Sequence, residues 1–263
     1  MYRYFIEMAY NGAAFHGWQV QANAVSVQAT VDDAIGKLMH CPIHVIGAGR
    51  TDTGVHASYF VAHFDSQEEI VNPNHFLYKV NRILPHHVVV YSIQLVDSQL
   101  HSRFSAITRT YHYNIVLTKD PFKREWAYFP VYDLDFELMN RAAKMLLEYT
   151  DFTSFSKLHT DVKTNNCSIL QAKWNQIDSD NWQFVIQADR FLRNMVRAIV
   201  GTLLDVGRNK ITLDDFRRII EAKHRGEAGS SAPAHALFLV DIEYRKESGF
   251  EPMPRQLSFR STL

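Results

Sequence analysis

Residues 47–57 read Gly47-Ala48-Gly49-Arg50-Thr51-Asp52-Thr53-Gly54-Val55-His56-Ala57 and follow the apolar pair Val45-Ile46. Another apolar run, residues 59–62, begins after Ser58. Such a density of glycine indicates a backbone that takes positive φ angles or that lets another molecule come close. We interpret Asp52 as a functional carboxylate displayed on a tight loop. The alternative is an ordinary turn in which the Asp52 side chain only caps its own backbone.

Three known motifs resemble parts of this stretch. The spacing of Gly49 and Gly54 is that of a phosphate-binding loop, but Val55-His56 stands where Lys-Ser/Thr is needed. Gly47-x-Gly49 opens a dinucleotide fingerprint, whose third glycine position holds the negative charge of Asp52. Residues 52–54 spell the aspartic-protease triplet, which occurs once in the chain. That chemistry needs two carboxylates, so it stays open only for a homodimer.

Composition limits the class of protein. The 263 residues suffice for one large domain or two small ones, and the formal net charge is zero. A nucleic-acid partner must therefore meet a local basic patch. The two cysteines, Cys41 and Cys167, are expected to be buried free thiols in a reducing compartment. We expect a soluble cytoplasmic protein without a metal, because the chain shows no signal peptide, no membrane-spanning run and no metal-ligand spacing among its histidines.

The segment before the loop predicts a strand, an aromatic turn and a helix. Residues 2–10 alternate as a strand, and Asn11-Gly12 breaks the pattern. Residues 15–21, Phe-His-Gly-Trp-Gln-Val-Gln, suit either stacking on RNA bases or insertion into a core. Ser26 is the expected N-cap of a helix with one apolar face.

The remaining elements follow from periodicity and from capping residues. Helices are expected from Asn72-Pro73 to before Pro85, over 135–148 and from Thr212. The tail beyond residue 245 is expected to be extended or mobile. Strands are expected at 59–64, 88–96, 109–115, 168–177, 182–188 and 237–244.

A second informative stretch is residues 191–201, Phe-Leu-Arg-Asn-Met-Val-Arg-Ala-Ile-Val-Gly. Its apolar periodicity predicts a mostly buried helix, within which Arg197 is a lone charge. A buried guanidinium is costly without a partner, so Arg197 is expected to meet a carboxylate or a phosphate. A structural ion pair and a functional contact are both open at this point.

Read together, these stretches closely resemble the tRNA pseudouridine synthase A family. The resemblance keeps the family's order of motifs and runs from about residue 2 to 244. One departure is Ala236, where the family usually carries Gly. The residues that carry the resemblance are 47–57, Arg109-x-Tyr111-x-Tyr113-x-Ile115, Phe191-Leu192-x-Asn194-Met195-Val196-Arg197-x-Ile199-Val200-Gly201, Tyr10-Asn11-Gly12, Gly17-Trp18-Gln19-x-Gln21, Ser26-Val27-Gln28, Asn81-x-x-Leu84-Pro85, Arg103-Phe104-x-Ala106 and 151–155.

The resemblance implies an α+β fold of two ferredoxin-like (RRM-like) halves. They would share one extended, mostly antiparallel sheet with helices on one face and a central RNA-binding cleft. The expected N-terminal half, residues 1–106, carries the Asp52 loop. The expected C-terminal half, residues 107–263, carries Tyr111 and Arg197.

The resemblance also implies an isomerase that converts uridine 38, 39 or 40 in the anticodon stem-loop of tRNA into pseudouridine. It would act as a homodimer with no cofactor. By the same match, Asp52 is the catalytic nucleophile, Arg197 is its basic partner, and Tyr111 contacts the uridine. The other expected substrate-binding residues are Arg50, Thr51, Gly54 and His56.

RNA binding by a neutral chain requires a local concentration of cations. A catalytically silent RNA-binding or chaperone protein of the same fold is the alternative, and the joint presence of Asp52, Tyr111 and Arg197 argues against it. The cations in or beside the motifs are Arg50, Arg103, Arg109, Lys157, Arg190 and Arg193.

Overall fold

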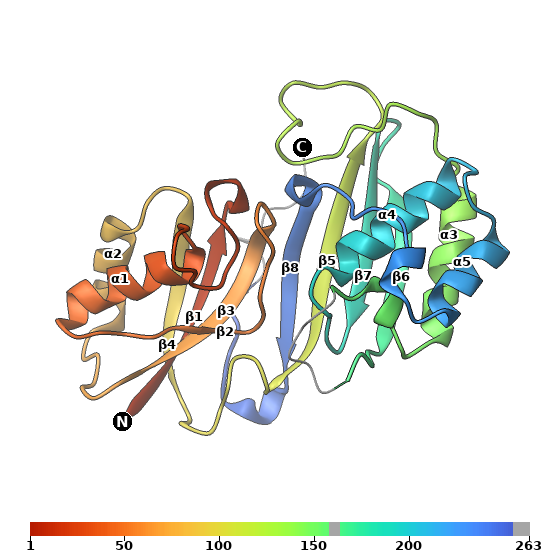
Figure 1. The fold of residues 1–263 in the computed structure, drawn as a ribbon. Coiled ribbons are helices and arrows are strands. Elements are labelled where there is room, and N and C mark those ends of the chain that lie inside the picture. Colours follow the sequence, from red (N-terminus) through yellow and green to blue (C-terminus); the bar gives the residue numbers. More distant parts are fainter. Residues whose placement is uncertain (158–163, 255–263) are drawn as a thin grey trace. The chain divides into compact units, whose positions relative to one another are not determined.

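The computed structural model describes residues 1–157 and 164–254, which hold eight strands and five α-helices (Figure 1). The chain packs as two compact units. The first contains Met1–Ile107 and the chain from Leu239, and the second contains Thr108–Phe238. No helix in the described part of the chain has both the length and the apolar character needed to cross a bilayer.

The first unit is a sheet covered by two helices. Strand β1 (Tyr2–Tyr10) lies between β4 (Val88–Val96) and β3 (His56–Ser66), antiparallel to both. The two-residue strand β2 (Ile46–Gly47) pairs with β3, and β8 (Leu237–Tyr244) is the other neighbour of β3.

Helices α1 (Val27–Met39) and α2 (Pro73–Ile83) pack on this sheet. The predicted caps are confirmed: Ser26 accepts a hydrogen bond from the Ala29 amide, and Asn72 accepts one from the His75 amide. The capping side chains satisfy amides that the first helical turn leaves without partners.

The second unit has its own antiparallel strands. Strand β7 (Asn181–Ala188) lies between β5 (Ala106–Val116) and β6 (Ile169–Gln176). The predicted strands at 109–115, 168–177 and 182–188 are thus confirmed to within a few residues.

Three helices belong to this unit: α3 (Phe136–Met145), α4 (Met195–Gly207) and α5 (Leu213–Glu221). The expected capping box at Thr212 is present, since Thr212 and Asp215 each bond the backbone amide of the other.

Aromatic side chains join the sheet and the helices of the second unit. The Phe136 ring, in the first turn of α3, stacks on Trp182 with ring centroids 3.9 Å apart. It also meets the edge of the buried Trp174 at 5.6 Å. The helical layer is therefore fixed to β6 and β7 by large apolar surfaces.

Two sequence-based expectations need correction. Cys41, expected to be buried, is exposed, whereas Cys167 is buried as expected. The tail beyond residue 245 is not simply extended: Phe250 is buried and its ring lies 5.0 Å from that of Phe5. The expected division into halves at residue 106 stays a prediction, and by packing the chain from Leu239 groups with the first unit. The physical reason is that β8 lies beside β3. The ferredoxin-like type of each half stays a prediction.

Candidate active site

The loop that carries Asp52 connects β2 to β3 in the first unit. Its start is held by a hydrogen bond from the Ala48 amide to the Val61 carbonyl at 2.8 Å. The Val55 amide donates to the Asp52 carbonyl at 3.1 Å, and Gly54 between them has φ +79°. A residue with a side chain adopts this φ only under strain, so the turn after Asp52 requires its glycine.

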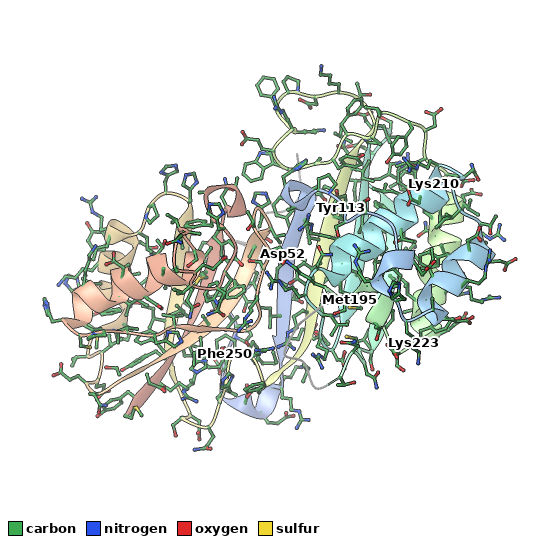
Figure 2. The ribbon with its side chains drawn as sticks, in the orientation of Figure 1. Asp52, Tyr113, Met195, Lys210, Lys223 and Phe250 are labelled. Carbon is green, nitrogen blue, oxygen red and sulfur yellow. The ribbon has the colours of Figure 1, made fainter. Side chains whose placement is uncertain are left out.

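Asp52 itself is half-buried and lies at the loop's turn (Figure 2). Arg50 is exposed, two residues before it. Thr51 and His56, by contrast, are buried, with exposed fractions of 7% and 1%. The expected contact of these two side chains with substrate stays a prediction, and in the structure both are buried against other residues of the first unit.

Thr51 contacts the end of strand β1. Its Oγ1 lies 2.9 Å from the Tyr10 hydroxyl, and its carbonyl accepts a hydrogen bond from the Trp18 amide at 3.2 Å. His56 Nδ1 accepts a hydrogen bond from the Gly12 amide at 3.0 Å. The residues on both sides of Asp52 are therefore bonded to the segment 10–18.

The backbone of this segment touches the backbone of the loop directly. A Cβ on Gly12 would stand 2.0 Å from the Val55 carbonyl oxygen. A Cβ on Gly17, where φ is +87°, would stand 2.5 Å from the Thr51 carbonyl oxygen. Only glycine permits such approaches, which explains the glycines on this side of the contact.

The aromatic residues of the segment 10–18 are buried in the core of the first unit. Trp18 is 2% exposed and stacks on Phe60 of β3, with ring centroids 4.2 Å apart. Phe15 is 4% exposed. Of the two roles left open for this segment, insertion into the core is the one that Phe15 and Trp18 adopt, because stacking on RNA requires an accessible ring face.

In the second unit, Tyr111 and Tyr113 stand on one side of β5. Tyr111 is half-buried, and its ring meets that of Phe191 edge-on, with centroids 5.2 Å apart. Tyr113 is fully buried, and burial raises the pKa of its hydroxyl well above its usual value. Its hydroxyl has no hydrogen-bond partner in the described structure.

Arg197 belongs to the second unit as well, in the first turn of α4. It is half-buried, less than expected for a charge in an apolar run. Its Nε donates to the Ala232 carbonyl at 2.8 Å, and the Ala232 amide donates to the Arg197 carbonyl at 2.9 Å. The positive charge of Arg197 also opposes the pKa rise of Tyr113, so the two side chains share one electrostatic environment.

The loop that holds Arg197, residues 225–236, covers one side of α4. Arg225 spans its turn by donating to the carbonyls of Ala228 and Gly229 and to the Ser231 hydroxyl. Ala236 ends the loop in a 3-10 turn, fully buried and without a positive φ. The residue in place of the family's usual Gly is therefore accommodated in a conformation that any residue adopts.

The site residues expected from the sequence fall into two groups. Arg50, Thr51, Asp52 and Gly54 share the loop of the first unit, which His56 follows as the first residue of β3, and Tyr111 and Arg197 share the second unit. The described residues hold no cluster of three or more His, Cys, Asp or Glu side chains suited to a metal ion. Sequence reasoning missed the support given by Tyr10, Gly12 and Gly17, although their motifs were visible as part of the resemblance.

Comparison with known proteins identifies the family. A family model described as tRNA pseudouridine synthase matches residues 142–245, which include α4 and Arg197. The tRNA pseudouridine synthase A of Parabacteroides distasonis is 55% identical over 247 residues, covering 94% of this chain and 98% of its own. The chain belongs to the tRNA pseudouridine synthase A family.

Other members of the tRNA pseudouridine synthase A family also match this chain over nearly its whole length. The Bacteroides fragilis protein is 54% identical, with 93% of this chain and 97% of its own covered. The Bacillus subtilis protein is 39% identical over 241 residues, with 90% and 97% covered. Alignments of this length leave out only residues near the ends, so they include the Asp52 loop as well as α4.

Proposed function

We propose that the protein isomerises uridine to pseudouridine at positions 38–40 in the anticodon stem-loop of tRNA, with Asp52 as its nucleophile. As a member of the tRNA pseudouridine synthase A family, the chain is an isomerase. The observation that carries the assignment of Asp52 is its setting: a half-buried carboxylate on a loop whose neighbours on both sides are bonded to buried segments.

The reaction conserves atoms and electrons, because its substrate and product are isomers. The N1–C1′ bond of uridine breaks, the base rotates, and a C5–C1′ bond forms. C5 then loses its proton, and N1 carries one in the product. A single carboxylate suffices for covalent catalysis of this kind, so the proposed mechanism uses no cofactor.

Tyr111 and Arg197 are proposed to complete the active site. The target base must leave its stack to be modified, and a half-buried aromatic ring is a suitable surface against which it can rest. Arg197 is proposed to hold and aim the Asp52 carboxylate, with bidentate hydrogen bonds as the favoured geometry. The hydrogen bond from Arg197 Nε to Ala232 supports this role, because it restricts the direction of the guanidinium.

Arg50 and Gly54 are the loop residues best suited to contact RNA. Arg50 is exposed and Gly54 offers its backbone beside Asp52. The cations Arg103, Lys157 and Arg193 are also exposed, as binding to phosphates requires. We propose that such residues line an RNA-binding cleft, and that the protein acts in the cytoplasm as a homodimer.

The variant Asp52→Asn tests the assignment. We expect it to release no tritium from C5 of labelled uridine in tRNA, because the amide is a poor nucleophile, while tRNA affinity stays within about tenfold, roughly 1.4 kcal/mol. Asp33→Asn is the control, since Asp33 is an exposed carboxylate of α1 that pairs only with Lys37 in the described contacts. Tritium release by Asp52→Asn would refute the nucleophile, and a collapse of binding would assign Asp52 a structural role.

Nucleoside analysis of tRNA treated with the wild-type protein tests the proposed positions directly, because pseudouridine should appear at positions 38–40.

A further inference from the structure

The hydroxyl groups of Tyr10 and Thr51 form a buried pair directly before Asp52. Their oxygens are 2.9 Å apart, and the residues are 4% and 7% exposed. Tyr10 is the last residue of β1, whose register with β3 places it opposite Ala57, the residue that follows the loop's His56. The pair therefore joins the loop to β1, an inner strand of the first unit's sheet.

Residues that follow β1 in the chain hold the loop through two further hydrogen bonds. The Trp18 amide donates to the Thr51 carbonyl, and the Gly12 amide donates to His56 Nδ1. These bonds fix the backbone before Asp52 and the side chain after Gly54. Of these contacts, the hydroxyl pair is the one formed by two side chains, so either partner can be substituted to break it.

We propose that Tyr10 and Thr51 are positioning residues, whose hydroxyl pair sets the direction in which Asp52 meets the sugar or base of the target uridine. The inference rests on the proposed function, in which Asp52 reacts with the substrate. Both side chains are buried, so they act through the loop and not by touching RNA. A misplacement of about 1 Å in a reacting group can reduce a rate on the order of a hundredfold.

A positioning role makes three kinetic predictions. Tyr10→Phe and Thr51→Val each remove one hydroxyl with little change in volume, and each should lower kcat about ten- to a hundredfold with KM within about twofold. The double variant should be no worse than the single variants, because either change already breaks the pair. Thr51→Ser keeps the hydroxyl and should recover most of kcat.

Tyr4→Phe is the matched control. Tyr4 also lies on β1 and is 1% exposed, and its hydroxyl accepts one hydrogen bond, from the Ile70 amide at 2.7 Å. Removing that hydroxyl disturbs the same strand away from the loop. Its kcat should stay within about twofold of wild type while its melting temperature falls, as expected for a buried hydrogen bond.

The experiment measures initial rates of tritium release from C5 of labelled tRNA at several tRNA concentrations, which give kcat and KM, together with the melting temperature of each variant. Wild-type kcat in folded Tyr10→Phe and Thr51→Val would overturn the proposal. So would a loss confined to KM, fully multiplicative effects in the double variant, or an equal loss in Tyr4→Phe. Should Thr51→Val not fold, Tyr10→Phe and Thr51→Ser decide alone. Activity in Asp52→Asn would instead refute the proposed function.

Discussion

The carboxylate of Asp32 on α1 accepts a backbone hydrogen bond in a partly buried position that disfavours its charged form. Its Oδ1 accepts from the Val45 amide at 2.7 Å, just before β2 and the Asp52 loop. Burial raises the pKa of Asp32 from 3.8 to about 6, although the Val45 bond and His44 act in the opposite direction. The folded protein thus holds the Asp32 proton more tightly than the unfolded chain does.

The sign of the resulting pH dependence follows from linkage. A raised pKa stabilises the fold fully below pH 3.8, and this contribution is lost as the pH rises through about 6. We expect Asp32→Asn, which keeps an acceptor for Val45, to be more stable than wild type above pH 6 by up to about 3 kcal/mol. The two proteins should differ little near pH 4.

Thermal melts between pH 4 and 8 measure this difference. Asp33→Asn, at the next position of α1, removes an exposed carboxylate and should show no comparable gain with pH. An equal stability difference at pH 4 and pH 8 for Asp32→Asn would contradict the prediction.

Two glycines near the active-site loop should respond oppositely to alanine. In Gly12→Ala the new Cβ would stand 2.0 Å from the Val55 carbonyl oxygen, a backbone atom that cannot turn aside. We expect a loss of at least about 3 kcal/mol in the free energy of unfolding. Gly49→Ala, where a Cβ meets nothing within 4 Å, should change it by less than about 1 kcal/mol. Urea unfolding of both variants tests the pair, and similar losses would show that the contact at Gly12 is not as tight as described.

At the scale of elements, helix α4 and the loop 225–236 form one assembly. Asn194 begins the helix with φ +66°, and its side-chain amide donates to the Ser231 hydroxyl at 2.7 Å. Further along the helix, the Thr202 hydroxyl accepts a hydrogen bond from the Gly229 amide at 3.0 Å. The Arg197–Ala232 bonds lie between these two points. The helix thus presents Arg197 from a backbone that is fixed on both sides.

Arg197 variants test the proposed partnership with Asp52. Arg197→Met removes the charge and should lower the rate of pseudouridine formation on the order of a hundredfold, because Asp52 loses its electrostatic partner. Arg197→Lys should keep part of the activity, since the charge survives but the bidentate geometry does not. Single-turnover assays at saturating tRNA measure the difference. Unchanged turnover in Arg197→Met would contradict the assignment.

At the scale of the whole molecule, the two units differ in how the chain builds them. The second unit is one continuous stretch, Thr108–Phe238, whereas the first requires residues from both ends of the chain. Within the first unit, the buried carboxylate of Glu7 accepts hydrogen bonds from the Tyr59 and Ser92 hydroxyls and from the Met253 amide. The first unit is therefore complete only when residues 239–253 have joined it.

A homodimer is the expected assembly. One chain with zero net charge offers few cations to a folded tRNA, and two copies double the surface available to a single RNA. We expect sedimentation equilibrium at micromolar concentration to give about twice the 30.4 kDa of one chain. Measurement in low and high salt controls for association driven by charge. A fully active monomer at these concentrations would contradict the prediction.

The sequence by itself determined the elements, their caps and the family. Capping residues and apolar periodicity are local signals, so Ser26, Asn72 and Thr212 began helices where they were expected. The glycine-rich turn around Asp52 was equally visible, because a positive φ at Gly54 depends on the residue itself.

Only the tertiary structure decided what lies beneath and beside those elements. Burial depends on residues distant in sequence, and no local pattern could show that Thr51 faces Tyr10 or that Trp18 stacks on Phe60. The exposure of Cys41 and the return of Phe250 to the first unit have the same cause. Each is set by which surfaces meet when the chain packs, and side-chain chemistry alone permits either outcome.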